Sequence, residues 1–366
     1  MPTTLTADAK ALLTLHLVPG IGPRLTAALL GRFGSAAAVL NASAGQLQEV
    51  PHIGKKLADA LVHAFHTRDV DAELDLMAKH SVWFVTLGEA GFPDSLTHIP
   101  DRPHLLYGRG ELKSSDSNAV ALVGSRNCTS YGRRIAERLA GDLARVGFTI
   151  ISGLARGVDG GAHRAAMQSG GRTLAVLAGG LSKIYPPEHV ELASEIESRG
   201  ALVTEAPMRM EPMSGMFPAR NRLISGLSRG VVVIEAAEKS GALITARHAA
   251  EQGRPVFAVP GPLDSPASAG THRLVRQGAI LIRSAEDILE ELDGVRTPAK
   301  PRPIELPPGL DNTQMRIWPH LQDRPHHMDE IAQQLSLRVP ELAAALLRME
   351  MKKLVRRLPG NQFERC

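Results

Sequence analysis

The chain contains a short apolar run, Ala119-Val120-Ala121-Leu122-Val123, which is followed at once by glycine and polar residues. Similar apolar runs recur downstream, with helical patterns between most of them, at residues 148–151, 173–178, 201–204, 231–234, 255–259 and 279–282. Continuous apolar runs of this length are typical of strands that are buried on both faces. Strands alternating with helices predict an α/β fold, an extended Rossmann-like parallel sheet covered by helices on both sides.

The regions outside this core predict smaller domains. Residues 1–75 show helical patterns only, whereas residues 76–292 hold the predicted sheet and begin it with a short strand at 82–86. A Pro-rich linker follows at 293–310, and residues 311–366 again have helical character. We therefore expect a helical N-terminal domain, a Rossmann-like core, a linker and a small C-terminal domain.

Composition narrows the class of protein. The chain has 366 residues, a net charge of +4 and two cysteines, Cys128 and Cys366, with no CxxC pair or Cys/His cluster beside either. It shows no basic leader segment and no long apolar run, so we expect a cytoplasmic protein without a membrane partner. Aromatic residues make up 4% of the chain, so a nucleic acid would be bound mainly through its phosphates and not by stacking on its bases.

An internal repeat marks the N-terminal part. Val18-Pro19-Gly20-Ile21-Gly22 recurs as Val50-Pro51-His52-Ile53-Gly54, and an apolar helical stretch follows each copy. The pair resembles tandem helix-hairpin-helix motifs, in which glycines expose backbone N–H groups at a helix N-terminus to a phosphate. His52 replaces one hairpin glycine, which puts phosphate contact by the second copy in doubt. A packing module without DNA contact is the alternative.

Polar and basic residues follow the predicted strands at the point where each strand ends. Because ligands of parallel α/β sheets bind beyond the carboxyl ends of the strands, we expect these residues to line one anion-binding groove. The candidate nucleic-acid-binding residues are Gly124, Ser125, Arg126, Gly153, Lys183, Arg220, Asn221, Arg222, Ser240 and Thr245. The alternative is that the glycines serve only the turns between strands and helices.

The sequence contains few of the motifs that are typical of catalysis or of cofactor binding. G-x-G-x-x-G is absent after the first core strand and no Walker A motif is present, so neither a nicotinamide cofactor nor ATP is expected. Asp159 and His163 share a helix face but lack a third metal ligand, so a capping Asp and a packed His are the favoured interpretation. Glu205 and Glu235 end strands and could serve as bases, yet no nucleophile accompanies them. We expect no cofactor, no metal and no catalytic residue.

The motifs, taken in order, resemble the DNA-processing protein A family (DprA/Smf). They are Gly124-Ser125-Arg126, the stretch 152–159, Tyr185-Pro186, Phe217-Pro218 with Arg220-Asn221-Arg222, Ser240-Gly241 with 243–246, and Val259-Pro260-Gly261. The resemblance implies a protein that binds single-stranded DNA, protects it during natural transformation and loads the RecA recombinase while displacing single-stranded-DNA-binding protein. It also implies phosphate contacts from Arg126 and Lys183.

The resemblance extends to assembly and to the C-terminal part. It implies a homodimer formed through the end of the Rossmann-like domain, with His272, Val275 and Leu281 in an apolar patch, although ordinary core packing would explain the same three residues. Residues 311–366 resemble a winged helix, with helices at 329–335 and 340–352 and a hairpin through 359–361. Balanced charge there leaves partner docking and DNA binding both open. A nucleotide-acting hydrolase and a pure adaptor remain the rival functions.

Overall fold

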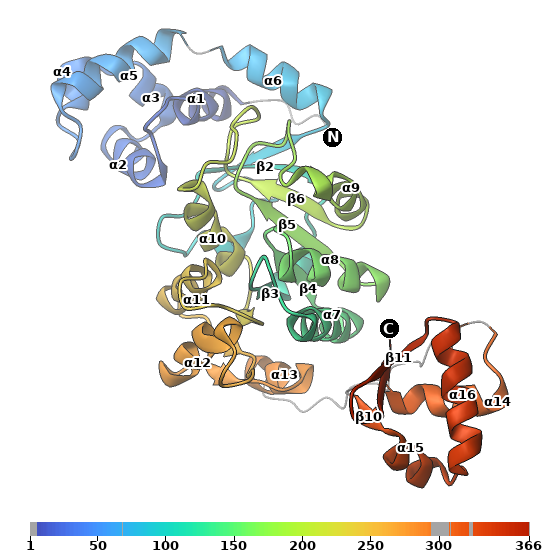
Figure 1. Cartoon of the computed structure of the whole chain (residues 1–366). Helices are drawn as coiled ribbons and strands as arrows, with labels where there is room; N and C mark the ends of the chain where they lie inside the picture. The colour runs from blue at the N-terminus through green and yellow to red at the C-terminus, as the bar shows by residue number, and fades with distance from the viewer. Residues whose placement is uncertain (1–5, 68, 294–306, 308, 322–324, 366) are drawn as a thin grey trace. The chain divides into compact units, whose positions relative to one another are not determined.

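The computed structural model describes residues 6–67, 69–293, 307, 309–321 and 325–365. The chain divides into two compact units, residues 1–299 and 300–366, which we treat separately. The first unit holds the helical N-terminal domain and the sheet, and the second holds the C-terminal domain (Figure 1).

A nine-stranded sheet organises the first unit, with strand order β1-β2-β6-β5-β4-β3-β7-β8-β9. From β6 to β9 every neighbouring pair is parallel, which confirms the predicted parallel core. The strands are β1 (Trp83–Thr86), β2 (Leu105–Gly110), β3 (Ala119–Val123), β4 (Thr149–Ser152), β5 (Thr173–Leu177), β6 (Ala201–Thr204), β7 (Gly230–Val233), β8 (Val256–Ala258) and β9 (Ile280–Leu281).

One edge of the sheet departs from the sequence expectation. Strand β2 pairs antiparallel with both β1 and β6, and the sequence analysis did not predict this strand. Its sequence, Leu-Leu-Tyr-Gly-Arg-Gly, is apolar only in its first half. In the structure the first four residues are buried and the last two are half-buried. Gly108 lies directly under the Trp83 ring, where a Cβ atom would come within 2.1 Å of the indole. This glycine therefore lets an aromatic ring cover the edge strand.

Helices cover the two faces of the sheet according to the alternation of side chains along each strand. Val120 and Leu122 of β3 pack with α7 (Ser130–Arg145), α8 (Val158–Gln168) and α13 (Ala285–Asp293). Ala121 and Val123 pack on the other face with α10 (Met216–Gly226) and α11 (Ala242–Glu251). Helices α9 (Val190–Arg199) and α12 (Ala269–Arg276) complete the domain. The carboxyl ends of the central strands are left for loops, as the sequence predicts.

The N-terminal domain contains the predicted repeat as two equivalent turns. Ile21 N donates to Val18 O and Ile53 N donates to Val50 O, at 3.2 and 3.1 Å. Gly20 has φ 88° and His52 has φ 72°, so the histidine adopts the left-handed conformation that the first turn gives to glycine. The helices are α1 (Ala7–His16), α2 (Pro23–Phe33), α3 (Ala36–Leu40), α4 (Ala44–Leu47), α5 (Lys55–Thr67) and α6 (Val70–Lys79).

The N-terminal domain packs directly against the sheet. Leu13 of α1 and Val70 and Met77 of α6 belong to one apolar cluster with Leu105 and Leu202 of the sheet. The expected domain boundary at residue 75 falls inside α6, a single helix that contacts both parts. The two turns therefore belong to a domain that is fixed against the sheet.

The second unit has the helices and strands of a winged helix. Strands β10 (His326–His327), β12 (Gln362–Arg365) and β11 (Val355–Leu358) form an antiparallel sheet in that order. Helices α14 (Asn312–Ile317), α15 (Met328–Leu335) and α16 (Val339–Met351) pack on it through an apolar cluster that includes Trp318. The Pro-rich linker expected at 293–310 lies largely outside the described residues. Within the described ranges, no helix has the length and apolarity needed to cross a membrane.

A fully buried histidine makes the core sensitive to acid. Thr173 Oγ1 donates to Ile150 O, so His163 Nδ1 must donate to Thr173 Oγ1, 2.7 Å away. The other ring nitrogen of His163 finds no hydrogen-bond partner among the described residues. Burial lowers the pKa of His163 to about 3 from its ordinary 6.5, and the ring stays neutral in the folded protein.

We predict that stability falls as the pH drops from 6.5 towards 3. The unfolded chain binds a proton at His163 in this window and the folded chain does not, so the loss is about 1.4 kcal/mol per pH unit for this group. His163→Asn should flatten the pH profile of urea denaturation. An unchanged slope in the His163 variant would contradict this account.

Candidate nucleic-acid interface

The loop after β3 is held by a buried carboxylate. Glu235, which follows β7 and is 3% exposed, accepts from Thr129 N at 2.8 Å and from Thr129 Oγ1 at 2.5 Å. Thr129 also caps α7 by accepting from Gly132 N at 3.1 Å. A Cβ atom at Gly132, in the first turn of α7, would lie 2.3 Å from Glu235 Oε2, so a larger residue there would displace this carboxylate. Glu235 therefore positions the start of α7, and both its oxygens are occupied in doing so.

The loop between β4 and α8 supports the loop after β3, which contains Ser125 and Arg126. Gly157, which precedes α8, has φ 73°, and a Cβ atom there would lie 2.3 Å from Ser125 O and 2.6 Å from Arg126 O. Val158 N then donates to Ser125 O at 3.2 Å. The carbonyls of Ser125 and Arg126 thus lie against the backbone of the β4–α8 loop, which supports the backbone of the loop that carries Arg126.

A buried cation joins α10 to the ends of two strands. Arg220 is 7% exposed, and its Nη1 donates to Gly153 O at 2.8 Å and to Val176 O. A Cβ atom at Gly153 would lie 2.4 Å from this nitrogen, so glycine is required beside the guanidinium. Burial lowers the pKa of Arg220 to about 10 while the Asp159 carboxylate raises it. Arg220 therefore remains charged at neutral pH.

Asp159 is the counter-charge of this arrangement. Its carboxylate accepts from Gly153 N at 3.0 Å and from Ala155 N at 3.3 Å, and burial raises its pKa. His163 bonds a different partner, Thr173, so the two side chains do not act as a pair. In the part of the chain that the structure describes, no three metal-ligating side chains come together.

The strand-end loops enclose a cleft of about 390 Å³, which we call the rim cleft. Arg126 and Lys239 are its exposed cations, and the guanidinium of Arg126 lies 4.7 Å from the centre of the Phe217 ring. The ring of Tyr185, 42% exposed, lies 6.0 Å from that of Phe217. The candidate residues that line the cleft are Gly124, Ser125, Arg126, Arg220, Asn221, Ser240 and Thr245.

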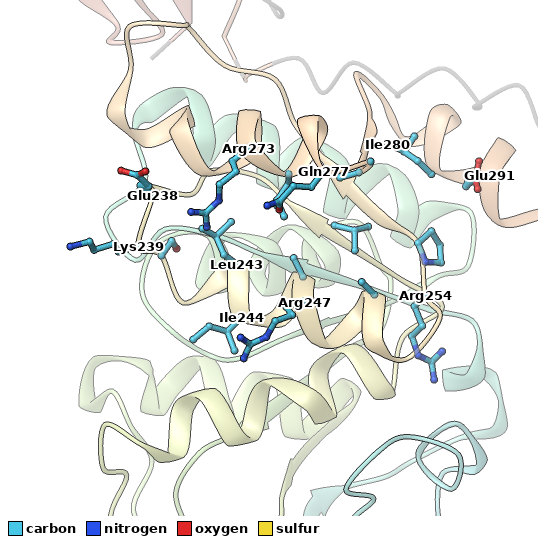
Figure 2. A pocket seen from close by; sticks show the side chains of 18 residues that line it. Glu238, Lys239, Leu243, Ile244, Arg247, Arg254, Arg273, Gln277, Ile280 and Glu291 are labelled. Atoms are coloured by element: carbon cyan, nitrogen blue, oxygen red, sulfur yellow. The ribbon is translucent and has the colours of Figure 1, made fainter.

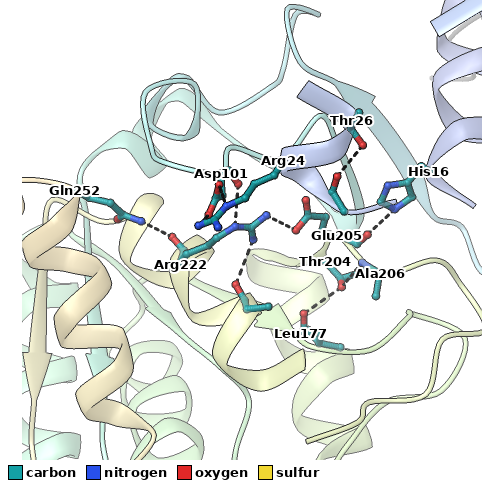
Figure 3. A network of polar contacts seen from close by, with 12 residues as sticks. His16, Arg24, Thr26, Asp101, Leu177, Thr204, Glu205, Ala206, Arg222 and Gln252 are labelled. Carbon is teal, nitrogen blue, oxygen red and sulfur yellow. Dashed lines mark hydrogen bonds and ion pairs between the residues drawn. The ribbon is translucent and has the colours of Figure 1, made fainter. Parts of the chain in front are cut away.

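Three candidate residues lie elsewhere. Gly153 is covered by the Arg220 guanidinium, and Lys183 is exposed on its loop, with Nζ 2.9 Å from Glu211 Oε1. Arg222 points away from the rim cleft: its Nη2 lies 2.6 Å from Glu205 Oε2, and its Nε donates to Asp101 O at 2.9 Å (Figure 3). Arg222 therefore belongs to the contact between the core and the N-terminal domain.

The structure adds residues that the sequence analysis did not select. Phe217 and Lys239 line the rim cleft, and Tyr185 adjoins it. Phe217 and Tyr185 stood in the quoted motifs, each before a proline, but the low aromatic content led us to discount stacking. Placing two of the few aromatic rings beside Arg126 gives the cleft a surface on which a base can stack.

A second cavity adjoins the rim cleft on the side of α12. It measures about 830 Å³ and shares Lys239 and Ser240 with the rim cleft (Figure 2). Leu243 and Leu274 form part of its wall, and Arg247 and Arg273 point towards it from α11 and α12. No sequence motif indicates this cavity, because it lies between helices and not at the end of a strand.

The expected dimer residues lie on adjoining elements at the β9 edge of the sheet. His272 and Val275 are half-buried on α12, and His272 Nε2 lies 3.1 Å from Gly261 O. Leu281 of β9 is 47% exposed.

Cys128, which precedes α7, is half-buried, and desolvation raises the pKa of its thiol. This is the opposite of what an activated cysteine requires.

Comparison of the chain with known proteins identifies the family to which it belongs. The sequence model of DNA recombination-mediator protein A matches residues 83–293, which is more than half of the chain. The chain belongs to this family. A SAM-like helix-hairpin-helix tandem matches residues 10–67, and a DprA winged helix domain matches residues 298–361, so both flanking domains are confirmed.

Individual relatives agree with the family assignment. Protein Smf of Escherichia coli is 39% identical over 304 residues, 81% of each chain, and DNA processing protein DprA of Bacillus subtilis is 44% identical over 57% of this chain and 70% of that protein. The crystal structure of DprA from Streptococcus pneumoniae matches with a TM-score of 0.68 at 32% identity, covering 80% of this chain and 99% of the other. DNA processing protein A from Helicobacter pylori, studied for its single-stranded DNA binding mode, matches with a TM-score of 0.52 at 33% identity over 57% and 95%.

We predict that Gly157→Ala destabilises the protein more than Gly147→Ala does. Both glycines have positive φ, so each alanine introduces a backbone cost of about 1–2 kcal/mol. Only at Gly157 does the new Cβ also meet backbone carbonyls, whereas nothing lies within 4 Å at Gly147. Urea denaturation of both variants measures the difference. Equal losses would show that the β4–α8 loop does not support the Arg126 loop.

Proposed function

We propose that this protein binds single-stranded DNA in the rim cleft. The observation that carries the proposal is the Arg126 guanidinium, exposed in the loop between β3 and α7 and lying over Phe217. The cation favours a phosphate, and the aromatic ring favours a base next to it. The relative from Helicobacter pylori, whose single-stranded DNA binding mode has been studied, supports the assignment.

The proposed contacts predict binding that tolerates any sequence. Arg126 and Lys239 meet phosphates, which carry no base information. Phe217 offers its face to a base, and every base has such a face. The strand-end loops border a space of about 390 Å³, and we expect it to admit a single strand in preference to a duplex. Equal affinity for a blunt duplex of the same length would contradict this.

The wider role that we propose is that of a recombination mediator without enzymatic activity. The protein would work in the cytoplasm, protect incoming single strands during natural transformation, displace single-stranded-DNA-binding protein and load the RecA recombinase. Two protomers joined through His272, Val275 and Leu281 would present two rim clefts and gain affinity from their effective concentration. Membership of the recombination-mediator family supports this role.

A nucleotide-acting hydrolase remains the rival function. It would need a base in the rim cleft that is free to act, and Glu235 is occupied by Thr129 while Glu205 is paired with Arg222. Incubation with nucleoside monophosphates separates the two functions. Release of free base would favour the hydrolase, and its absence while DNA is bound would favour the mediator.

We predict that Arg126→Ala lowers the affinity for labelled oligo-dT about tenfold, the loss expected for a charge-assisted contact. The slope of log affinity against log salt should become shallower by about 0.7, which corresponds to one phosphate. Fluorescence anisotropy across a salt series measures both quantities. Arg32→Ala is the matched control, because Arg32 also lies over a ring, that of Phe33 at 5.4 Å, but far along α2. Equal effects of the two variants would contradict the site.

We also predict that Leu281→Lys gives a monomer that binds oligo-dT more weakly and loads RecA poorly. A charge on this exposed leucine opposes burial against a second copy, yet it leaves the protomer folded because the side chain is not in the core. Light scattering gives the mass, and RecA ATPase activity on strands coated with single-stranded-DNA-binding protein gives the loading. A monomeric wild type, or a variant that loads RecA normally, would contradict the proposed dimer.

A further inference from the structure

Helix α16 of the second unit (Figure 1) carries a row of exposed apolar residues, which we call the α16 stripe. Leu347 is 59% exposed and Met351 is 79% exposed, and Pro340 and Ala344 are exposed as well. The spacing of these four residues follows i, i+4, i+7 and i+11, which places side chains on one face of a helix. The α16 stripe therefore runs along the whole length of the helix.

The α16 stripe is separate from the core of the second unit. The side of α16 that faces this core carries four buried residues, Leu342, Ala345, Leu346 and Met349. At about 100° per residue, the α16 stripe points about 180° away from that side. A helix that is apolar on two opposite sides is typical of one that is buried between two neighbours. The core of the second unit supplies one of these neighbours.

The composition of the α16 stripe favours a protein neighbour over DNA. In winged helices that read DNA, the third helix enters the major groove and meets base edges with polar and basic side chains. Here Leu347 occupies the centre of the exposed face, with Ala344 and Met351 beside it, and charged residues stand only at its borders. An exposed apolar patch with a charged border is typical of a protein–protein contact.

The charges at the border of the α16 stripe identify that protein as a second copy of this chain. Glu341 near the start of α16 and Arg348 near its end are both exposed and lie on the same side of the stripe, two helical turns apart. In an antiparallel pair of α16 helices, Glu341 of each copy therefore comes beside Arg348 of the other. Lys352, which follows the helix, adds a second cation near this glutamate. Across the opposite border Glu350 meets Ala343, so like charges do not face each other.

The apolar residues are complementary in size in the same antiparallel arrangement. The register that joins the charges sets Ala344 against Leu347 of the other copy. It also sets Pro340 against Met351. A small residue opposite a large one allows two helices to pack closely. The twofold axis then repeats each contact, as in other symmetric dimers.

We propose that α16 pairs antiparallel with α16 of a second copy of this chain, through the α16 stripe and ion pairs between Glu341 and Arg348. The thirteen residues of α16 span about 20 Å, so the contact falls short of the roughly 800 Å² per partner of a stable interface. The pairing is therefore weak, and it is distinct from the proposed dimer contact at the β9 edge of the sheet. It gains strength where protomers are held close together, as on one DNA strand. This last consequence alone rests on the proposed function.

The test uses the full chain with Leu281→Lys, which removes the proposed contact at the β9 edge. Sedimentation velocity without DNA should show a monomer in dilute solution that forms dimers as the protein concentration rises. Adding Leu347→Asp should weaken this dimer at least about tenfold, because it places a charge in the apolar contact. Leu347 is exposed, so the variant stays folded. Gln333→Asp adds the same charge at an exposed position of α15 and is the matched control.

An exchange of charges tests whether the partner is a second copy. In the same Leu281→Lys chain, Arg348→Glu places a carboxylate beside Glu341 of the other copy and should weaken the dimer about tenfold. Glu341→Lys together with Arg348→Glu restores opposite charges and should return the association to that of the parent chain. Within its own unit, Arg348 Nη2 lies 3.4 Å from Asp311 Oδ2. Both Arg348→Glu chains lose that contact, so it cannot cause a difference between them.

Three results would overturn the inference. One is a Leu281→Lys chain that stays monomeric at every concentration, and another is a dimer that Leu347→Asp leaves as strong as Gln333→Asp does. The third is a double variant that associates as weakly as Arg348→Glu alone, because the α16 stripe would then contact something other than a second copy. All these measurements are made without DNA, so the proposed function and this inference can fail independently.

Discussion

The buried guanidinium of Arg220 is the constraint on which the arrangement of the site depends. A charge in the interior must be compensated, and here the carbonyls of Gly153 and Val176 and the carboxylate of Asp159 do so. These partners belong to the ends of β4 and β5 and to α8. Arg220 therefore fixes α10 against the carboxyl edge of the sheet, and α10 in turn carries Phe217 to the place where Arg126 can lie over it.

The same helix also carries the contact with the N-terminal domain. Arg222 binds Glu205 and the carbonyl of Asp101, and the Asp101 side chain binds Arg24 of α2 (Figure 3). The apolar packing of α1 and α6 on the sheet adds to this contact. Helix α10 thus lines the rim cleft, presents the Phe217 ring and holds the N-terminal domain in place through Arg222. These roles explain why its sequence departs so far from a simple amphipathic pattern.

Much of this architecture was predictable from the sequence, since each buried strand appears as an apolar run and parallel strands bring their following loops to one edge. The failures have physical reasons. Arg220 and Arg222 are two positions apart, and at 3.6 residues per turn their side chains point about 160° apart, so both could not enter one cleft. Strand β2 pairs at an antiparallel edge and lacks a continuous apolar run. The cleft between the first hairpin (residues 16–23) and α10 depends on how the N-terminal domain packs on the sheet, which no local pattern in the sequence encodes.

The most direct test of the central claim is photocrosslinking with oligo-dT that carries 4-thiothymidine, followed by mass spectrometry of the attached peptides. If a single strand occupies the rim cleft, the crosslinks should fall on the peptides that contain residues 124–128 and Phe217. Crosslinks confined to residues 311–365, with none at the strand ends, would show that the winged helix binds the DNA and that the sheet edge does not.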